Sequence, residues 1–370
     1  MKRDENFISI KFSIITVCYN EEKTIRDTIE SVLNQKWHNL EYIIVDGGSE
    51  DATLEIIQQY AKKDKRIRWF SGKDSGIYNA MNKGICLAEG EFVYFLNAGD
   101  VLHSDNVLEK VSEIAVGIDI LIGDIALKSD TGIVEHSYAV GKELRENLEQ
   151  GQCVCHQVIF ASKRCMEGGF DEQFQICADY DWLCRQVCSG KRIVKADIII
   201  VDYDTQGVSN QVQYQKMRLK ENFKVIEKSF PELKYRYSED IKKIILKECK
   251  ELYQYKFMNQ WLFLKQRGAD FSSFFRKQEI KSIAVYGVHY MGQRLYDELK
   301  GSQVEVKYAI DIRPNKDKWK IPVVHPDDTL ESVDAVVITP FFDFLEIKAI
   351  LSEKLDCPMI SIEDMLFCEY

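Results

Sequence analysis

Four short apolar runs, separated by longer polar and helix-type segments, most constrain the fold of the first hundred residues. The runs are rich in β-branched and aromatic residues and span residues 12–19, 40–45, 66–70 and 91–96. Between the first two runs, apolar residues recur at helical spacing over residues 25–33. Alternation of strands and helices at this spacing predicts a parallel sheet in an α/β layer fold.

Three of the predicted strands are followed by an aspartate. Asp46 ends the second strand, Asp74 follows the third, and Asp100 follows the fourth. Ligands of such sheets bind at the carboxyl ends of the strands, so these carboxylates are expected at one edge. Crowded carboxylates repel one another unless a cation lies between them or a ligand donates hydrogen bonds. The sequence therefore predicts a site for a divalent cation, since Mg²⁺ and Mn²⁺ prefer oxygen ligands.

Five motifs, in order, resemble the family-two glycosyltransferases with a GT-A fold, and most closely the branch whose nucleotide motif reads Asp-Gly-Gly-Ser. Several motifs in the right order are more specific than any single one. The resemblance covers about residues 10–210 and implies a nucleotide-sugar-binding domain. The motifs are Thr16–Asn20, Val45–Thr53, Gly76–Gly84, Phe95–Asp100, and the pair Gly168–Asp171 with Ala178–Leu183.

The resemblance implies which residues bind the nucleotide-sugar donor. Val17 and Tyr19 would line the pocket for the base, and Asp46 would hydrogen-bond that base. Many relatives carry a second acid where this chain has Gly47, so donor recognition would rest on fewer groups. Uridine is the family's default base, while guanosine and thymidine stay open. The full set of expected donor-binding residues is Val17, Tyr19, Asp46, Asp74, Asn79, Asn97 and His156.

The metal ligand and the catalytic base follow from the same resemblance. Asn97 and Gly99 stand where other branches carry the two acids of an Asp-x-Asp motif. Asp100 is therefore the one expected protein ligand for Mn²⁺ or Mg²⁺, beside diphosphate oxygens and water. Asp179 would be the general base, and His156 lies where the family lines the acceptor entrance.

A sugar hydroxyl is a poor nucleophile at neutral pH, so a positioned carboxylate must take its proton. The leaving diphosphate develops negative charge, which a divalent metal neutralises. The predicted function is an inverting, metal-dependent, hexosyltransferase-type glycosyltransferase that acts on a glycan or lipid-linked acceptor in surface polysaccharide biosynthesis. A nucleotidyltransferase would usually show a Gly-rich loop near the first strand, which is absent here. A non-catalytic nucleotide-sugar-binding or scaffold protein stays open.

Two features have simpler interpretations. Without the other motifs, Asp179 and Asp181 would be taken as surface acids of a helix, and Asp181 is expected to be structural. The run Cys153-Val-Cys155-His156 places two thiols and an imidazole, which are all metal-ligating groups, close together in the sequence. Because no second pair follows at zinc spacing, zinc is disfavoured.

The charge and cysteine content narrow the class of protein. The formal net charge of −10 disfavours nucleic acid as a partner, since nucleic acid selects basic faces. Eleven cysteines without a disulfide-framework spacing indicate a reducing compartment. The amino terminus lacks the apolar core of a signal peptide, and no apolar run reaches membrane-spanning length. We expect a cytoplasmic protein, with contact at the inner face of the membrane left open.

Three regions are expected: a GT-A domain over residues 1–211, a helical linker over 212–279 and a Rossmann-like α/β domain over 280–370. The linker is rich in Lys and aromatic residues, which would suit a membrane surface near a lipid-linked acceptor. Acidic residues interrupt this basic face, which favours instead packing of the linker against the flanking domains or a second subunit.

In the last region, Gly287, Gly292 and Asp311 match a dinucleotide fingerprint. His289 replaces its middle glycine, so we expect no ordinary NAD binding.

Overall fold

The computed structural model describes residues 9–129, 132–204, 212–233, 237–313 and 319–368. Its packing divides the chain into two compact units. Unit 1 comprises the described residues of Met1–Gly207 and Lys220–Tyr237, and unit 2 those of Val208–Leu219 and Ser238–Tyr370. The stretch 212–279, which the sequence assigns to a linker, is thus divided between the two units.

Unit 1 is built on a nine-stranded sheet in the order β3-β2-β1-β4-β8-β6-β9-β5, with β7 paired to β6. The strands β3, β2, β1 and β4 are parallel to one another, whereas β8 runs antiparallel to β4 and to β6. The predicted α/β fold is confirmed. The strands are β1 (Phe12–Cys18), β2 (Leu40–Asp46), β3 (Ile67–Ser71), β4 (Phe92–Phe95), β5 (Val101–Leu102), β6 (Ile120–Ser129), β7 (Gly132–His136), β8 (Ile159–Ser162) and β9 (Ile193–Asp204).

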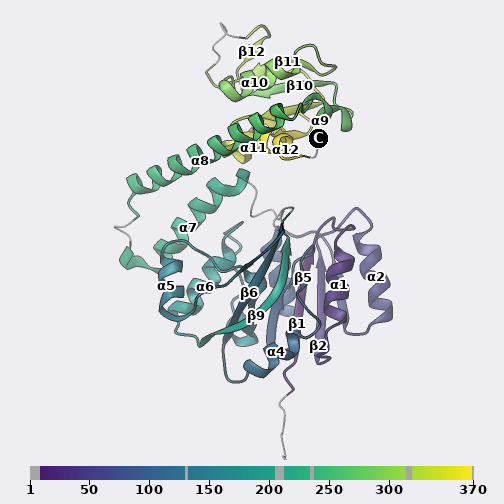
Figure 1. Cartoon of the computed structure of the whole chain (residues 1–370), viewed down its shortest axis with the longest axis vertical. Helices are drawn as coiled ribbons and strands as arrows, with labels where there is room; N and C mark the ends of the chain where they lie inside the picture. The colour runs from purple at the N-terminus through teal and green to yellow at the C-terminus, as the bar shows by residue number, and fades with distance from the viewer. Residues whose placement is uncertain (1–8, 130–131, 205–211, 234–236, 314–318, 369–370) are drawn as a thin grey trace, which may run out of the picture. The chain divides into compact units, whose positions relative to one another are not determined.

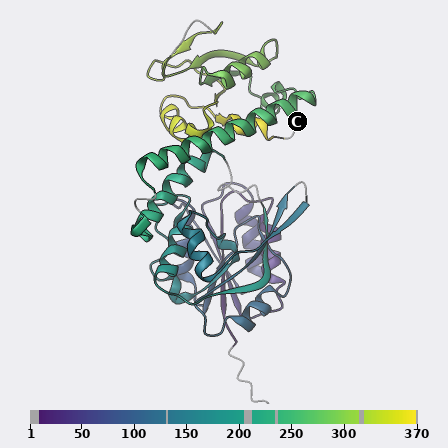
Figure 2. The same cartoon turned by 60° about the vertical axis from the view of Figure 1, so that its left-hand side comes forward.

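Helices cover both faces of this sheet. The helices α1 and α2 lie on one side and α5 and α6 on the other (Figures 1 and 2). The inward stripe of α1 includes Ile25, Ile29 and Val32, all fully buried, as the helical spacing predicts. The helices are α1 (Ile25–Leu33), α2 (Thr53–Lys63), α3 (Ile77–Leu87), α4 (Val107–Ile114), α5 (Gly141–Glu149) and α6 (Ala178–Cys188), with short 3₁₀ turns at η1 (His156–Val158), η2 (Lys163–Met166) and η5 (Pro231–Leu233).

The register of the parallel strands aligns their carboxyl ends. Asp46, the last residue of β2, pairs with Cys18 of β1 on one side and with Ser71 of β3 on the other. The loops that carry the sequence motifs therefore leave the sheet at one edge, as expected for a parallel α/β sheet.

Helix α7 (Gln215–Ser229) spans the division between the units. Its residues 215–219 belong to unit 2 and its residues 220–229 to unit 1. Val225 and Ile226 of its second part are buried in the core of unit 1.

Unit 2 has its own five-stranded parallel sheet in the order β12-β11-β10-β13-β14. The second α/β unit that the sequence predicts is therefore present. Among the described residues, no helix has the length and apolarity that crossing a membrane requires. The elements are β10 (Ser282–Tyr286), β11 (Glu305–Ile310), β12 (Val323–Val324), β13 (Ala335–Ile338), β14 (Met359–Ser361), α8 (Glu239–Gln266), α9 (Ser272–Lys277), α10 (Tyr290–Leu299), α11 (Phe344–Ser352), α12 (Ile362–Leu366), η4 (Val212–Tyr214) and η6 (Phe341–Asp343).

Candidate active site

The Asp46 carboxylate anchors the loop that follows β2. It is 1% exposed and accepts hydrogen bonds from the hydroxyls of Ser49 at 2.5 Å and Ser71 at 2.6 Å. The backbone N–H groups of Gly48 and Ser49 also donate to it, each at 3.2 Å. Both carboxylate oxygens are thus engaged within the chain. The contact of Asp46 with a nucleotide base stays a prediction.

Gly47 brings two predicted donor-binding residues together. A Cβ atom built on Gly47 would lie 2.9 Å from Oδ2 of Asp74 and 3.5 Å from Cδ2 of Tyr19. The Asp74 carboxylate therefore fills the space that a side chain at position 47 would need. Tyr19 is exposed beside it, whereas Val17, two residues earlier in β1, is buried in the core.

Asn79 is used in a contact within the chain. Its amide in α3 donates to Oε2 of Glu172 at 3.0 Å, and Asn82 donates to Oε1 of the same carboxylate at 2.8 Å. These two hydrogen bonds lower the pKa of Glu172, and the one from Asn82 has the larger effect. The structure thus ties α3 to the loop before α6, and a contact of Asn79 with the donor stays a prediction.

His156 joins the end of β4 to the start of α6. Its Nδ1 atom lies 2.9 Å from Oδ2 of Asp179, and its Nε2 atom lies 3.1 Å from Nδ2 of Asn97. A carboxylate accepts and an amide NH₂ donates, so in this arrangement Nδ1 of His156 donates to Asp179 and Nε2 accepts from Asn97. Three residues expected at the site are therefore linked in one hydrogen-bonded chain.

Tyr78 of α3 adds a further group to Asp179. Its hydroxyl lies 2.6 Å from the carbonyl oxygen of Ile176 and 3.1 Å from Oδ1 of Asp179. Burial and the negative charge of Asp179 raise the pKa of Tyr78 well above its ordinary value, so the hydroxyl keeps its proton. The Asp179 side chain, held in this way, is still 17% exposed.

Asp100 and Asn97 form the second half of the site. Asp100 is 4% exposed, and its Oδ2 atom accepts from Nε2 of Gln157 at 3.0 Å. The Cys155 thiol donates to Oε1 of Gln157 at 2.6 Å, and burial raises the pKa of that thiol, which keeps it protonated. The loop after β4 is thereby held against η1 at two points, through Gln157 and His156.

The site has one unsatisfied oxygen that suits a cation. Oδ1 of Asn97 is buried and has no hydrogen-bond partner in the part of the chain that the structure describes. A buried acceptor without a donor is costly, and a hard cation is one partner that satisfies it. Asp100 stands three residues away in the chain, and the binding of a divalent metal by these residues stays a prediction. Among the described residues, no three His, Cys, Asp or Glu side chains gather to hold a metal ion.

Asp181 lies behind the site and is structural. It is completely buried, and its carboxylate accepts from Nε of Arg185 at 2.9 Å and from Nζ of Lys228 at 2.8 Å. Burial alone would lower the pKa of Lys228, but Asp181 and Asp171 outweigh it and raise that pKa.

Several contacts at the candidate site were not expected from the sequence. Tyr78 stood inside a recognised motif, and Gln157 stood next to His156, but nothing in the spacing indicated their partners. Glu221 of α7 contacts the segment before α6. The sequence around Glu221 predicts only a helix and gives no sign of this contact.

In unit 2, the loop that matches the dinucleotide fingerprint forms hydrogen bonds with side chains of the chain itself. The Nδ1 atom of His289 accepts from the N–H of Met291 at 3.3 Å and so caps the start of α10. Oδ2 of Asp311 accepts from the N–H of Val288 at 2.8 Å. A dinucleotide would need both the helix end and the acid. Weak or absent NAD binding stays a prediction, and these contacts give its physical reason.

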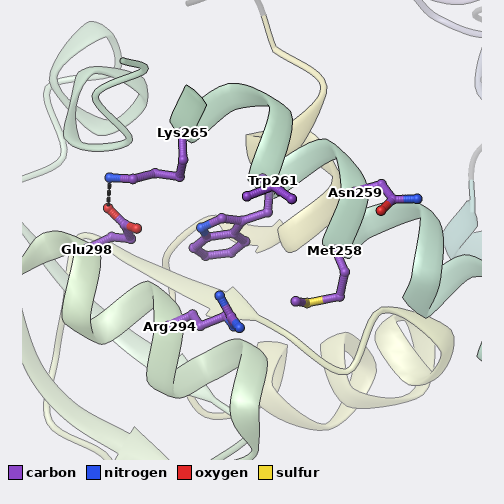
Figure 3. A pocket seen from close by; sticks show the side chains of 7 residues that line it. Met258, Asn259, Trp261, Lys265, Arg294 and Glu298 are labelled. Atoms are coloured by element: carbon purple, nitrogen blue, oxygen red, sulfur yellow. Dashed lines mark hydrogen bonds and ion pairs between the residues drawn. The ribbon is translucent and has the colours of Figure 1, made fainter. Parts of the chain in front are cut away.

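A cavity of about 440 Å³ lies between α8 and α10 in unit 2 (Figure 3). Nζ of Lys265 pairs with Glu298 at 2.6 Å on one side, and Arg294 extends toward the ring of Trp261 (Figure 3). The lining contains none of the residues expected to bind a donor or a metal. It consists of Met258, Asn259, Trp261, Leu262, Lys265, Arg294 and Glu298.

Residues 13–154 match the model described as Glycosyl transferase family 2. An uncharacterized glycosyltransferase of Mycobacterium tuberculosis is 30% identical over 214 residues, which cover 54% of this chain and 76% of that protein. A PGL/p-HBAD biosynthesis glycosyltransferase of Mycobacterium bovis is 27% identical over 210 residues, 54% of this chain and 80% of that protein. Among solved structures, TarS 1-349 of S. aureus aligns with a TM-score of 0.48 and 19% identity, covering 63% of this chain and 68% of that one.

Proposed function

This chain belongs to glycosyl transferase family 2, and we propose that it transfers a sugar from a nucleotide-sugar donor to a hydroxyl group of an acceptor. The observation that carries this proposal is the Asp179 carboxylate, which His156 and Tyr78 hold beside the edge of the sheet where the sequence motifs lie. A partly exposed carboxylate in a fixed orientation is what a general base requires.

Asp179 takes the proton of the acceptor hydroxyl as that oxygen attacks the anomeric carbon of the donor. The new carbon–oxygen bond forms while the bond from the anomeric carbon to the diphosphate breaks. The diphosphate leaves with the electron pair. One displacement of this kind inverts the anomeric configuration and needs no covalent intermediate.

His156 and Tyr78 orient the base. The ring Nδ1–H of His156 donates to one carboxylate oxygen, and the Tyr78 hydroxyl, whose single proton is shared with the carbonyl oxygen of Ile176, lies 3.1 Å from the other. Fixing the carboxylate in one orientation removes the entropy cost of finding it during the reaction. His156 is in turn held by Asn97, so the end of β4 and the base are positioned together.

The leaving diphosphate requires positive charge or hydrogen-bond donors near the end of β4. Asp100, with the unsatisfied Oδ1 of Asn97, would hold Mn²⁺ or Mg²⁺, which neutralises charge on a diphosphate. A site with so few protein ligands should bind metal weakly until the donor's phosphate oxygens complete it.

Tyr19 and Asp74 would contact the nucleoside part of the donor, because both lie against Gly47 at the end of β2. An exposed aromatic ring offers a stacking surface for a base, and a carboxylate accepts from ribose or sugar hydroxyls. Uridine remains the default base from family membership.

Helix α8 offers a surface for a lipid-linked acceptor. Residues 252–268 contain no Asp or Glu but carry Lys256, Lys265 and Arg267. Apolar side chains beside cations suit the surface of an anionic bilayer. The apolar residues exposed on this part of α8 are Leu252, Tyr255, Leu262 and Phe263.

The test is consumption of a panel of nucleotide sugars by the full-length chain, with Mn²⁺ and with EDTA, beside equilibrium binding of the same donors. The proposal expects one donor to be consumed and its sugar to reach an acceptor or water. Binding without consumption across donors and acceptors would instead support a non-catalytic nucleotide-sugar-binding protein.

A further inference from the structure

We propose that Glu221 of α7 is a positioning residue for the general base. Its buried carboxylate fixes the segment from which Asp179 projects. This inference rests on the proposed function, in which Asp179 takes the acceptor's proton. Glu221 lies well outside residues 13–154, which the family model matches.

Glu221 binds three consecutive backbone N–H groups. Its Oε1 atom accepts from the N–H of Gln175 at 2.8 Å, and its Oε2 atom accepts from those of Ile176 at 2.9 Å and Cys177 at 3.0 Å. The side chain is 6% exposed, so these bonds face little competition from water. A carboxylate that accepts three N–H groups holds a short backbone segment in one conformation.

These three amides directly precede α6, whose first turn carries Asp179. The N-terminal end of a helix has unpaired N–H groups and a partial positive charge, so an anion there is favourable. Glu221 supplies that anion from another helix. The start of α6 is therefore fixed by a residue far from it in the sequence.

The same segment also holds the Tyr78 side of the base. The carbonyl oxygen of Ile176 accepts from the Tyr78 hydroxyl, which also contacts Asp179. Both polar backbone groups of Ile176 are thus engaged, the N–H by Glu221 and the carbonyl by Tyr78. Loss of the Glu221 charge would let this segment shift, and Tyr78 and Asp179 would lose their relative placement.

A second residue of α7 holds α6 at its inner face. Nζ of Lys228 lies 2.8 Å from Oδ1 of Asp181 and 3.1 Å from Oδ2 of Asp171. Lys228 satisfies a buried carboxylate that faces away from the base, so its loss should affect folding. Glu221 differs because its contacts lead to Asp179 through Ile176 and Tyr78.

The experiment uses the full-length chain with Glu221→Gln, which keeps the shape of the side chain and removes its charge. Glu227→Gln is the matched control, since Glu227 is an exposed carboxylate on the same helix. The turnover number, the donor dissociation constant and amide hydrogen exchange of residues 175–177 are measured. Each glutamate variant is also made in an Asp179→Asn background.

We expect Glu221→Gln to lower turnover about 10- to 100-fold with donor affinity unchanged, because small displacements of a catalytic group have effects of this size. In the Asp179→Asn background the same change should lower turnover by less than about twofold, since residues that act as a unit are not additive. Exchange of amides 175–177 should become faster in Glu221→Gln and stay unchanged in Glu227→Gln.

An equal loss of turnover with and without Asp179 would overturn the inference and leave Glu221 with a stabilising role alone. Unchanged exchange at residues 175–177 would overturn it as well. If the wild-type chain transfers no sugar, the proposed function fails, while the exchange measurement still decides whether Glu221 holds this segment.

Discussion

The Nδ1 atom of His156 lies 2.9 Å from Oδ2 of Asp179, which joins a short 3₁₀ turn after α5 to the first turn of α6. On its other side the same imidazole ring meets Asn97, at the end of β4. The candidate base is thereby tied to the strand end where the donor's diphosphate would lie. In the proposed function, a single histidine would couple the acceptor side of the site to the donor side.

The assignment of the base predicts the behaviour of Asp179→Asn. This change keeps the shape of the side chain and removes its proton affinity. Turnover should fall about 10²- to 10⁴-fold while donor binding stays nearly intact. Steady-state transfer and equilibrium donor binding check this. The matched control is Asp197→Asn, whose side chain is fully exposed on β9 and should be silent. Near-normal transfer by Asp179→Asn would show that another group removes the proton.

The metal assignment predicts that UDP or a UDP-sugar binds tightly only in the presence of Mn²⁺ or Mg²⁺. Asp100→Ala should abolish that dependence, because it removes the one carboxylate expected to bind the cation. Calorimetric titrations with metal and with EDTA measure the effect. Asp105→Ala, at a solvent-exposed acid near the same loop, is the control. Equally tight binding of UDP in EDTA by the wild-type chain would refute this assignment.

The packing around Gly47 predicts that one added methyl group at this position weakens donor binding. In Gly47→Ala the new Cβ would press on the Asp74 carboxylate at 2.9 Å and displace it. We expect the donor dissociation constant to rise about tenfold, equivalent to one lost hydrogen bond to a charged group. Gly72→Ala is the matched control, because a Cβ there meets no atom within 4 Å. Equal donor affinity in both variants would exclude Asp74 from the donor site.

The exposed face of α8 predicts binding to anionic membranes. Leu262→Asp should weaken association with phosphatidylserine-containing vesicles about tenfold or more, because it replaces an inserting apolar side chain with a repelled charge. Vesicle sedimentation at fixed salt measures this. Val116→Asp, at an exposed apolar position of unit 1, serves as control. A change in oligomeric state without a change in vesicle binding would assign this face to a second copy of the chain.

Glu41 predicts a pH dependence of stability in unit 1. Burial alone would raise the pKa of Glu41, but hydrogen bonds from Ser13 and from the N–H of Glu89, with Lys11 and Arg68 nearby, outweigh it and lower the pKa. At neutral pH, Glu41→Gln should reduce the free energy of unfolding by about 1–3 kcal/mol.

The sign of that dependence follows from the lowered pKa of Glu41. The stabilisation is fully present above the unfolded-state pKa of about 4.3 and is lost as the pH falls through the folded-state pKa. The difference between wild type and Glu41→Gln should therefore shrink on acidification. Denaturant unfolding at neutral and acidic pH measures it, and a difference that grows toward acid would contradict the assignment.

Much of the fold could be predicted because short apolar runs in the local sequence identify the strands. The first three predicted strands agree with β1, β2 and β3 to within about one residue, since their apolar runs end at polar turn residues. The packing of α7 was not predictable in the same way. A periodic helix can cover any apolar surface, and residues 220–229 pack in unit 1 rather than in a separate linker.

The residue types of the candidate site could be predicted from the sequence, while their contacts could not. The types of residue at Asp100 and Asp179 follow from their motifs, because each motif supplies a carboxylate at a strand or helix end. The link from Asn97 through His156 to Asp179 joins three separate segments of the chain. Such long-range contacts leave no trace in local spacing, and the same holds for Glu221 and its three amides.

The most direct test of the account is the anomeric configuration of the product, followed by NMR from the first turnovers with the donor that the chain consumes. The account predicts a product of inverted configuration, formed by the wild-type chain with Mn²⁺ or Mg²⁺ and about 10²- to 10⁴-fold more slowly by Asp179→Asn. A product of retained configuration would contradict it, because retention requires a mechanism other than one displacement assisted by Asp179.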